Sequence, residues 1–376
     1  MWVAIIIILL TFLFWFLGHE GIVKLNKQRP KLNSKKLPPI SVIIPAYKSE
    51  KTIEQTLKSV KELDYPKKEI IVINDSDDRT PQIAKSYGAK IIQNKKRMGK
   101  SVSLDMATEK AKNEILLFLD SDTVVEKEGL KKTIPWFSKP NIAAVMPTFV
   151  AKNNKGIAKL VSIENTFIQS HLRTHMYLGS LISFRGCCFA MRKSVIQKMG
   201  GWGRILTEDN EMGARIAKSD HVIQWEPKVI ARTEEPETRE ELKKQKIRWG
   251  AGSAYTFFRH RKYYRKSPQF LMYFLPYIIL GFLVAVLVLW HLYLFASTLS
   301  IIPILNLIIE LVIITIATYI HVIILIYSER GSVNPLLLVK YILYYTPLVT
   351  LFYFKGFVKG VRSKKNKKDE LDLTLW

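Results

Sequence analysis

The sequence predicts an α/β fold in which a mostly parallel, Rossmann-like sheet is joined to transmembrane helices at both ends of the chain. Between residues 40 and about 120, short apolar runs alternate with stretches of helical periodicity. Long uncharged apolar segments lie near both ends of the 376 residues, and lysine and arginine gather beside them. Alternating strands and helices are typical of a parallel sheet, and basic flanks are typical of membrane segments.

The first element is an uncharged apolar run over residues 2–17, "WVAIIIILLTFLFWFL", which is about long enough to span a bilayer. A cleaved signal peptide is the alternative, but no basic segment precedes the run and no small-residue cleavage site follows it. We therefore predict an uncleaved transmembrane anchor over residues 1–20 with its N-terminus outside. A basic, proline-containing linker over residues 21–39 follows it.

Four strands and three helices come next in alternation. The strands are "ISVIIPAY", "KEIIVIND", "AKIIQN" and "EILLFLDSD", and the helices between them are "EKTIEQTLKSVKEL", "DRTPQIAKSYG" and residues 100 to about 111. Near-continuous apolar strands indicate a parallel sheet that is covered on both faces. We assign residues 40–240 to this domain, and we expect its site at the carboxyl ends of the strands, where such sheets bind ligands.

Apolar segments dominate the C-terminal part. No aspartate, glutamate, lysine or arginine occurs from Ser267 to Ile309. Within a membrane region of residues 268–358 we expect helices at about 269–294, 301–327 and 336–354. A basic interfacial segment (241–267) precedes this region, and a basic tail (359–376) follows it.

The predicted membrane topology contains a conflict of parity. An outside N-terminus followed by four crossings would place the basic tail outside, although lysine and arginine favour the cytosolic side. Residues 336–354 contain Lys340 and several tyrosines. We therefore expect this segment to lie in the interface or to re-enter instead of crossing.

The net charge of +25 would suit a nucleic-acid binder, but the position of the charge argues against one. Six basic residues lie between Lys24 and Lys36, nine between Lys243 and Lys266, and seven between Lys355 and Lys368. These clusters flank the apolar segments and indicate membrane lipids as partners, with no nucleic acid. The only cysteines, Cys187 and Cys188, make no disulfide framework, which favours a reducing, cytosolic setting.

Asp120 and Asp122 follow directly after the apolar strand "ILLFL". Side chains alternate along an extended chain, so both carboxylates face the same side. Each unpaired carboxylate would raise the pKa of the other, and a divalent cation removes this conflict. Mg²⁺ and Mn²⁺ prefer oxygen ligands and often keep substrate phosphates in their shell. We predict that Asp122, helped by Asp120, binds Mn²⁺ or Mg²⁺.

Asp75 and Asp78 follow the second strand, so these acids and Tyr47 are expected at the same edge of the sheet. Asp75 there can accept hydrogen bonds from a base N–H or a ribose hydroxyl. The alternative is a turn in which Asp78 or Thr80 caps the next helix. The two roles are compatible with each other.

These stretches together resemble the family 2 glycosyltransferases, which are inverting enzymes of the GT-A fold that use nucleotide-activated sugars. The resemblance covers residues 40 to about 255. "PAYKSE" resembles P-x-Y-N-E, "NDSDDRT" resembles D-D-S-x-D-x-T with Asn74 in place of the first aspartate, and "MGKSVSLD" resembles G-K-x-x-A-L-N with Asp105 in place of asparagine. The resemblance implies nucleotide contacts from Pro45, Tyr47, Glu50, Asp75, Lys100 and Asp120.

Two further motifs narrow the resemblance. In "TED", Asp209 corresponds to the family's general base, with Glu208 beside it. Gln245, Arg248 and Trp249 form the Q-x-x-R-W signature of a membrane-bound branch that is similar to the hyaluronan, chitin and cellulose synthases. This signature implies further nucleotide contacts, and the forked guanidinium of Arg248 suits a pyrophosphate. For Trp249, an interfacial tryptophan near the membrane remains an alternative.

"SFRGCCFAMRK" occupies the place of a family segment near the acceptor. The resemblance implies that Arg185, Gly186 and Cys187, with Trp202 of "GGW", contact the acceptor. A tight strand turn with small buried thiols is the alternative for the first three.

The resemblance implies a metal-dependent hexosyltransferase, multi-pass in the cell membrane, with a cytosolic catalytic domain. We expect transfer from a nucleotide-sugar donor, with a UDP-sugar favoured, to a growing polysaccharide, in a processive reaction coupled to export. The small number of spans requires an oligomer to complete a polymer channel, or favours the alternative, non-processive glycosylation of a membrane lipid.

Overall fold

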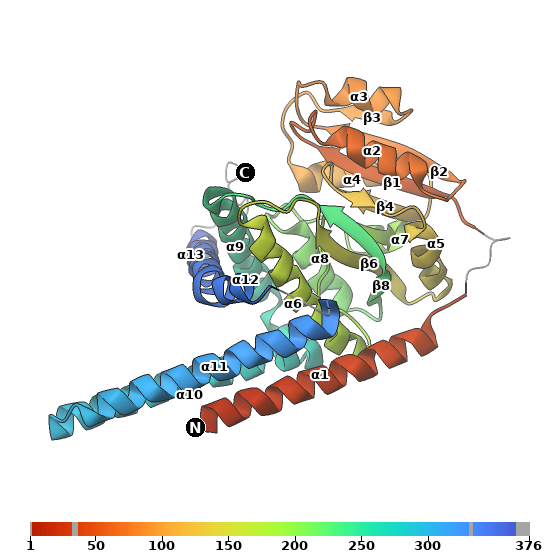
Figure 1. Cartoon of the computed structure of the whole chain (residues 1–376). Helices are drawn as coiled ribbons and strands as arrows, with labels where there is room; N and C mark the ends of the chain where they lie inside the picture. The colour runs from red at the N-terminus through yellow and green to blue at the C-terminus, as the bar shows by residue number, and fades with distance from the viewer. Residues whose placement is uncertain (1, 32–36, 331–333, 366–376) are drawn as a thin grey trace.

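The computed structural model describes residues 2–31, 37–330 and 334–365 and has an eight-stranded mixed sheet at its centre (Figure 1). The strand order is β3-β2-β1-β4-β7-β6-β8-β5. The strands are β1 (Ile40–Ala46), β2 (Lys68–Asn74), β3 (Lys90–Gln93), β4 (Ile115–Leu119), β5 (Val124–Val125), β6 (Ile142–Ala151), β7 (Cys188–Arg192) and β8 (Val222–Thr233). The predicted α/β class with a mostly parallel sheet is confirmed.

The first four strands form a parallel half as predicted. Their β-branched apolar residues favour extended backbone, and Val42, Ile43 and Ile44 of β1 are fully buried on both faces of the sheet. The connections are α2 (Ile53–Glu62), α3 (Thr80–Ser86) and α4 (Lys100–Lys110). Because β1, β2 and β4 run in the same direction, the residues that follow them meet at one edge.

The second half of the sheet has elements that the sequence pattern did not resolve. Strand β7 pairs antiparallel with β4, and the N–H of Asp120 donates to the carbonyl of Cys187 at 2.9 Å. The segment before β7 therefore lies beside the segment after β4. The helices of this half are α5 (Gly129–Thr133), the 3₁₀ helix η2 (Ile134–Ser138), α6 (Ala158–Tyr177), α7 (Lys193–Lys198) and α8 (Glu208–Ala217).

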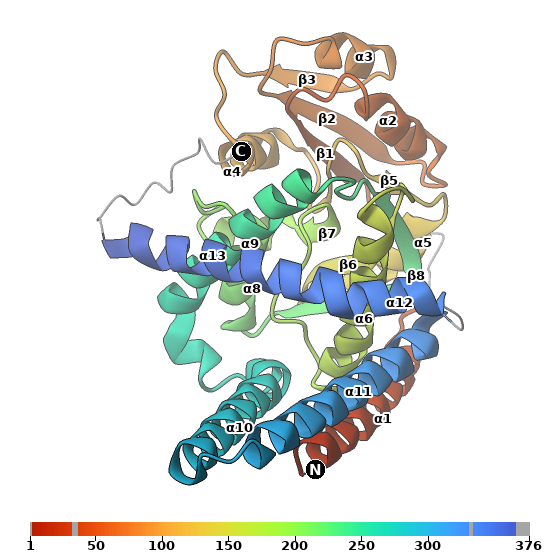
Figure 2. The same ribbon diagram turned by 60° about the vertical axis from the view of Figure 1, so that its left-hand side comes forward.

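Three long helices run side by side away from the sheet: α1 (Trp2–Gln28), α10 (Pro268–Thr298) and α11 (Ile302–Arg330) (Figures 1 and 2). By length and composition, the described residues contain three candidate membrane spans, Ile5–Gln28, Ile302–Tyr327 and Pro335–Arg362, and a shorter apolar helix, Phe282–Thr298. Helix α1 continues to Gln28, into the segment that we expected to be a linker.

The C-terminal segment takes a different course. It consists of α12 (Pro335–Lys340), the π-helical turn η3 (Tyr341–Tyr345) and α13 (Thr346–Lys365). In Figure 2 this segment crosses the direction of α10 and α11, and α13 lies along α9 (Arg239–Tyr264). Helix α9 begins at a capping box, in which Thr238 and Glu241 satisfy each other's backbone N–H groups.

Glycines bring α9 and α13 into backbone contact. A Cβ atom on Gly356 would lie 2.1 Å from the carbonyl oxygen of Ile247, and one on Gly360 would lie 2.5 Å from that of Ala251. From the other side, a Cβ atom on Gly250 would lie 2.2 Å from the carbonyl oxygen of Tyr353. No larger residue fits at these positions without separating the helices, so the position of α9 depends on α13.

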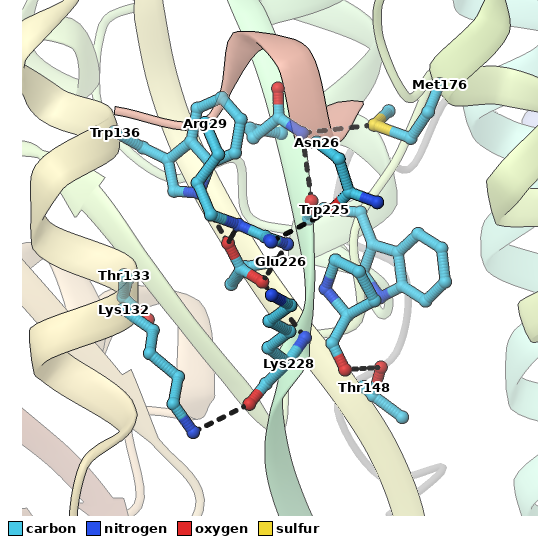
Figure 3. Close-up of polar contacts among 12 residues, drawn as sticks. Asn26, Arg29, Lys132, Thr133, Trp136, Thr148, Met176, Trp225, Glu226 and Lys228 are labelled. Carbon is cyan, nitrogen blue, oxygen red and sulfur yellow. Dashed lines mark hydrogen bonds and ion pairs between the residues drawn. The ribbon is translucent and has the colours of Figure 1, made fainter. Parts of the chain in front are cut away.

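A buried carboxylate fixes the end of the N-terminal helix to the sheet (Figure 3). Arg29, just after α1, donates two hydrogen bonds to Glu226 of β8, at 3.0 Å from Nε and 2.8 Å from Nη2. Trp136 donates from Nε1 at 2.8 Å, and Glu226 is fully buried. A buried carboxylate is tolerated only with such partners, so this pair specifies where α1 docks.

We expect Gly356→Ala to lower the melting temperature of the detergent-solubilised protein, because the added methyl collides with the Ile247 carbonyl. Overpacking of this kind costs about 1–3 kcal/mol. Thermal unfolding measures the change, with Lys359→Ala on the exposed side of the same helix as control. Equal melting temperatures for the two variants would contradict this close contact.

We expect Arg29→Met to destabilise the protein by about 3–5 kcal/mol, because it leaves the Glu226 carboxylate buried without its cation. Lys27→Met, at an exposed position near the end of α1, is the matched control and should change stability by less than about 0.5 kcal/mol. Denaturant unfolding in detergent measures the free energy of unfolding of both variants. A loss of stability that is no larger for Arg29→Met than for Lys27→Met would show that the Arg29–Glu226 pair does not hold α1.

Candidate active site

A cavity of about 1080 Å³ lies at the carboxyl edge of the parallel strands and extends to α6, α9 and α13. Most of the predicted site residues line it, although they come from segments that are far apart in the sequence. These residues are Pro45, Tyr47, Asp75, Lys100, Asp120, Asp122, Arg185, Gly186, Cys187, Glu208, Asp209, Gln245, Arg248 and Trp249.

Lys100, the first residue of α4, joins the carboxylates of this cavity. Its Nζ lies 2.7 Å from Asp120 Oδ1 and 3.3 Å from Glu208 Oε1, and it donates to the carbonyl of Gly186 at 3.3 Å. Burial disfavours the ammonium ion, but Asp120 and Glu208 outweigh this effect and raise the pKa of Lys100. Lys100 is therefore a fixed positive charge between the end of β4 and the start of α8.

Asp122 is less well compensated than Asp120. Its Oδ1 accepts hydrogen bonds from the hydroxyls of Thr123 at 3.1 Å and Thr233 at 3.4 Å. Burial, with the neighbouring Asp120, raises the pKa of Asp122 to about 6. A carboxylate in this state gains from a cation, and Asp122 is therefore the better placed of the two to bind one.

The two aspartates fit a divalent ion that takes further ligands from a substrate. The described residues contain no group of three or more His, Cys, Asp or Glu side chains arranged to hold a metal. Mg²⁺ is commonly held by one or two carboxylates, with substrate phosphates and water completing its shell, and Mn²⁺ accepts the same oxygen ligands. Asp120 and Asp122 match that donor set.

Asp75 organises the loop before α4. Its Oδ2 accepts from the backbone N–H groups of Met98 at 3.0 Å and Gly99 at 2.8 Å, and its Oδ1 accepts from the side chains of Asn94 at 2.5 Å and Ser103 at 3.1 Å. Gly99 has a φ of +84°, which favours glycine. Asp75 thus holds the loop that presents Lys100 to the cavity.

Arg97 on the same loop is a cavity residue that the sequence reasoning missed. Its guanidinium lies 4.1 Å from the ring centroid of Tyr47, which is 40% exposed. Both side chains line the cavity, so their paired planar faces form one wall. The basic run around Arg97 gave no signal that set it apart from surface lysines.

Asp209 lies in the first turn of α8. Its Oδ2 accepts from the backbone N–H of Gly186 at 2.7 Å, and a Cβ atom on Gly186 would lie only 2.9 Å from that oxygen. Glycine at position 186 therefore lets the strand turn approach the carboxylate. The preceding Glu208 is buried, and burial raises its pKa although Lys100 opposes the shift.

Arg185 forms a buried polar network on the opposite side of that turn. It donates to Asn165 at 2.7 Å and to Glu235 at 3.3 Å, and Asn165 donates to Glu235 at 2.8 Å. Burial raises the pKa of the adjacent Cys187 thiol, although Arg185 opposes the shift. The thiol is therefore neutral, and Arg185 and Glu235 are the charged groups of this wall.

Gln245, Arg248 and Trp249 lie on one face of α9, because residues three and four apart in a helix are neighbours. All three line the cavity, and Gln245 Oε1 is buried and accepts no hydrogen bond from the described residues. A buried amide oxygen without a donor is costly, and a ligand hydroxyl or N–H would satisfy it.

Two predicted site residues do not line the cavity. Trp202 is 3% exposed and packs against Phe118 and Phe189, with centroid separations of 5.2 and 5.7 Å. Glu50 is exposed, and its carboxylate accepts from the backbone N–H of Arg79 at 3.2 Å. Both side chains support the site from outside: Trp202 fills the core beneath β4, and Glu50 joins two loops at the sheet edge.

Aromatic residues from α9 and α13 complete the cavity, and the sequence gave no sign of them. Phe257 and Tyr264 come from α9, and Tyr353 and Phe357 come from α13. From α6, His171 and His175 also reach the cavity, and burial lowers the pKa of His171 to about 4 and that of His175 to about 3. The half of the cavity away from the carboxylates is thus largely aromatic and uncharged.

Residues 41–200 match the model of a family described as Glycosyl transferase family 2. A poly-beta-1,6-N-acetyl-D-glucosamine synthase from Staphylococcus epidermidis is 31% identical over 222 residues, which cover 57% of this chain and 54% of that protein. The probable glycosyltransferase YdaM of Bacillus subtilis is 30% identical over 256 residues, which cover 63% of this chain and 61% of that protein. The chain thus spans less than two thirds of the length of these relatives.

The fold is shared with a solved structure of the mannosyltransferase PcManGT from Pyrobaculum calidifontis, in complex with GDP-Man and Mn²⁺. The TM-score is 0.64 at 18% identity, and the superposition covers 96% of this chain and 99% of that chain. The predicted GT-A fold is thereby confirmed.

The raised pKa of Asp122 makes cation binding pH-dependent. An unfolded aspartate titrates near pH 4, so the contribution of protonated Asp122 to stability is lost as the pH rises from about 4 through about 6. Above that window we expect a cation to take the place of the proton. We expect Mn²⁺ with UDP to raise the melting temperature at about pH 7.5 and to have little effect at about pH 5.

Asp122→Asn should remove most of this Mn²⁺ effect, whereas the exposed control Asp220→Asn should keep it. A Mn²⁺-induced shift of equal size at both pH values would argue against Asp122 as a ligand.

Proposed function

We propose that the chain is an inverting glycosyltransferase that moves a sugar from a nucleotide-sugar donor to a growing polysaccharide at the membrane. The match of residues 41–200 to the glycosyl transferase family 2 model supports this proposal. The observation that carries the proposal is the convergence of three groups in one cavity: the carboxylates Asp120 and Asp122, the carboxylate Asp209, and Arg248. These are the groups that the displacement of a nucleoside diphosphate by a hydroxyl requires.

The donor nucleotide is assigned to the wall formed by Tyr47 and Arg97, with the diphosphate near Asp120, Asp122 and Arg248. Planar aromatic and guanidinium faces suit a base, and a forked guanidinium suits a pyrophosphate. Mn²⁺ or Mg²⁺, held by Asp122 and Asp120, would neutralise charge on the departing diphosphate. Lys100 holds Asp120 in place for this role.

Asp209 is proposed as the general base. The acceptor hydroxyl gives its proton to the carboxylate, its oxygen forms a bond to the anomeric carbon, and the electron pair of the breaking C–O bond leaves with the diphosphate. A direct displacement of this kind inverts the configuration at that carbon. The hydrogen bond from the Gly186 N–H fixes one carboxylate oxygen and so orients Asp209.

The similarity to poly-beta-1,6-N-acetyl-D-glucosamine synthases supports a polysaccharide as acceptor. The UDP-sugar donor rests on the resemblance of the sequence motifs alone. The aromatic wall from α9 and α13 suits sugar rings, which stack on flat apolar faces. The same wall suits the chain of a membrane lipid, and this keeps lipid glycosylation as the second candidate. Arg185 and Gly186 line the same cavity and Gly186 donates to Asp209, and we assign both residues to the acceptor.

We propose that α1, α10 and α11 cross the cell membrane and that α12, η3 and α13 lie in the interface. Their mutual orientation supports this arrangement, since the C-terminal segment crosses the direction of the other three. With three crossings and an outside N-terminus, both the catalytic domain and the basic tail are on the cytosolic side, as the positive-inside rule requires. Association into an oligomer would add helices around an exported polymer.

Incubation of the purified protein with Mn²⁺ and a panel of radiolabelled nucleotide sugars tests the function. A long labelled product would support the polysaccharide synthase, and a lipid carrying a single sugar would support the second candidate. Release of no nucleoside diphosphate from any donor would contradict the proposed activity.

We expect Asp209→Asn to lower kcat by roughly 10²–10⁴-fold, because the amide cannot accept the proton of the acceptor. Binding of UDP with Mn²⁺, measured by calorimetry, should be unchanged. Asp220→Asn, at an exposed carboxylate beyond α8, serves as the control for both measurements. Full turnover by Asp209→Asn would exclude it as the base.

A further inference from the structure

Lys246 lies inside the Q-x-x-R-W stretch of α9 but does not line the cavity. Its side chain is only 1% exposed, and Nζ lies 2.6 Å from Glu164 Oε2 on α6. An ammonium ion with almost no exposure is stable only beside a well-placed anion. The pair therefore fixes the orientation of Lys246 relative to α6.

The same carboxylate oxygen ties in the C-terminal segment. The hydroxyl of Tyr345, at the end of the π-helical turn η3, donates to Glu164 Oε2 at 2.8 Å. Tyr345 is 1% exposed. Single π-helical turns often occur at functional positions, and this one directs a buried hydroxyl to the carboxylate that neutralises Lys246.

The other contact of Lys246 is with the site. Its Nζ lies 4.1 Å from the centroid of the Trp249 ring, within the range of a cation–π interaction. Trp249 lines the cavity beside Arg248. The ammonium ion thus lies between the carboxylate of Glu164 and the face of an active-site ring.

We propose that Lys246 and Glu164 are positioning residues that hold the Trp249 ring in the cavity wall, and that Tyr345 makes the C-terminal apolar segment part of this support. The contacts form a chain in which Tyr345 binds Glu164, Glu164 binds Lys246, and Lys246 contacts the ring of Trp249. Each member is buried or partly buried, so water competes weakly for these contacts. The active site then depends on the docking of the C-terminal segment, although Tyr345 itself does not reach the cavity. This proposal builds on the proposed function. Of its two tests, only the turnover measurement depends on that function.

Fluorine NMR of the detergent-solubilised full chain, labelled with 5-fluorotryptophan, tests the positioning without any ligand. Trp249→Phe identifies the resonance of Trp249. We expect Lys246→Met, Glu164→Gln and Tyr345→Phe each to shift or broaden that resonance, because each weakens the support of the ring. Lys246→Arg, which keeps the charge, should restore most of its position.

Lys243→Met is the matched control, since Lys243 lies one turn earlier on α9 and its exposed side chain contacts only the exposed Glu240 among the ion pairs of the described residues. This variant should leave the Trp249 resonance unchanged. The proposal is overturned if the Trp249 resonance is the same in Lys246→Met as in Lys243→Met. It is also overturned if Lys246→Met, Glu164→Gln and Tyr345→Phe all leave the resonance in place while thermal unfolding shows that they are folded.

A double-mutant cycle gives the second readout. We expect Lys246→Met to lower kcat/KM by roughly five- to tenfold in the wild-type background, which is the size of a cation–π interaction. In the Trp249→Leu background the same substitution should have no further effect, because the ring that it positions is gone. Additive losses would show that Lys246 acts on the fold alone. If no donor is turned over, the proposed function fails, and the NMR experiment still decides the positioning role.

Discussion

The ammonium group of Lys100 is the interaction on which the catalytic half of the molecule depends. Three chain segments bring carboxylates or a carbonyl to it: Asp120 after β4, Glu208 at the start of α8, and Gly186 before β7. Without a cation at their centre, these groups would repel one another in a buried space. The loop that delivers Lys100 is itself held by three hydrogen bonds to Asp75, and Ser103 of α4 donates a fourth. The Asp75 carboxylate therefore contributes to the site through the backbone it fixes.

This network explains why two acids can end an apolar strand. Asp120 is neutralised within the protein, whereas Asp122 has two hydroxyl donors and a raised pKa of about 6. The two aspartates therefore have different roles. Asp120 forms an ion pair with Lys100, whereas Asp122 has no such partner among the described residues and is free to bind an external cation. We expect a site with one compensated and one uncompensated carboxylate to bind a divalent ion weakly until a substrate adds phosphate oxygens, which would couple ion binding to donor binding.

The parallel half of the sheet and most of the site were predictable, because short-range patterns specify them. Apolar runs define β1 to β4, and the acids after them must meet at one edge. Contacts across long sequence separations were not predictable. The family resemblance implied an acceptor contact for Trp202 of "GGW", but packing against Phe118 and Phe189 places this side chain in the core. Arg97 lies in a basic run whose letters do not distinguish a cavity residue from a surface one. The extension of α1 to Gln28 depends on docking through Arg29 and Glu226, a pair separated by most of the domain.

The apolar C-terminal segment contacts the elements of the active site through its backbone as well as through side chains. Helix α13 can approach α9 only because Gly356 and Gly360 face its carbonyl groups, and α9 carries Gln245, Arg248 and Trp249 into the cavity. A helix that crossed the membrane along the direction of α10 and α11 could not also lie along α9, since α13 crosses that direction. The glycine contacts and the Tyr345–Glu164 hydrogen bond are independent observations, and both indicate that the C-terminal segment is docked against the catalytic domain. We therefore propose that the apolar C-terminal segment rests at the membrane surface, where α13 adds Tyr353 and Phe357 to the wall of the cavity.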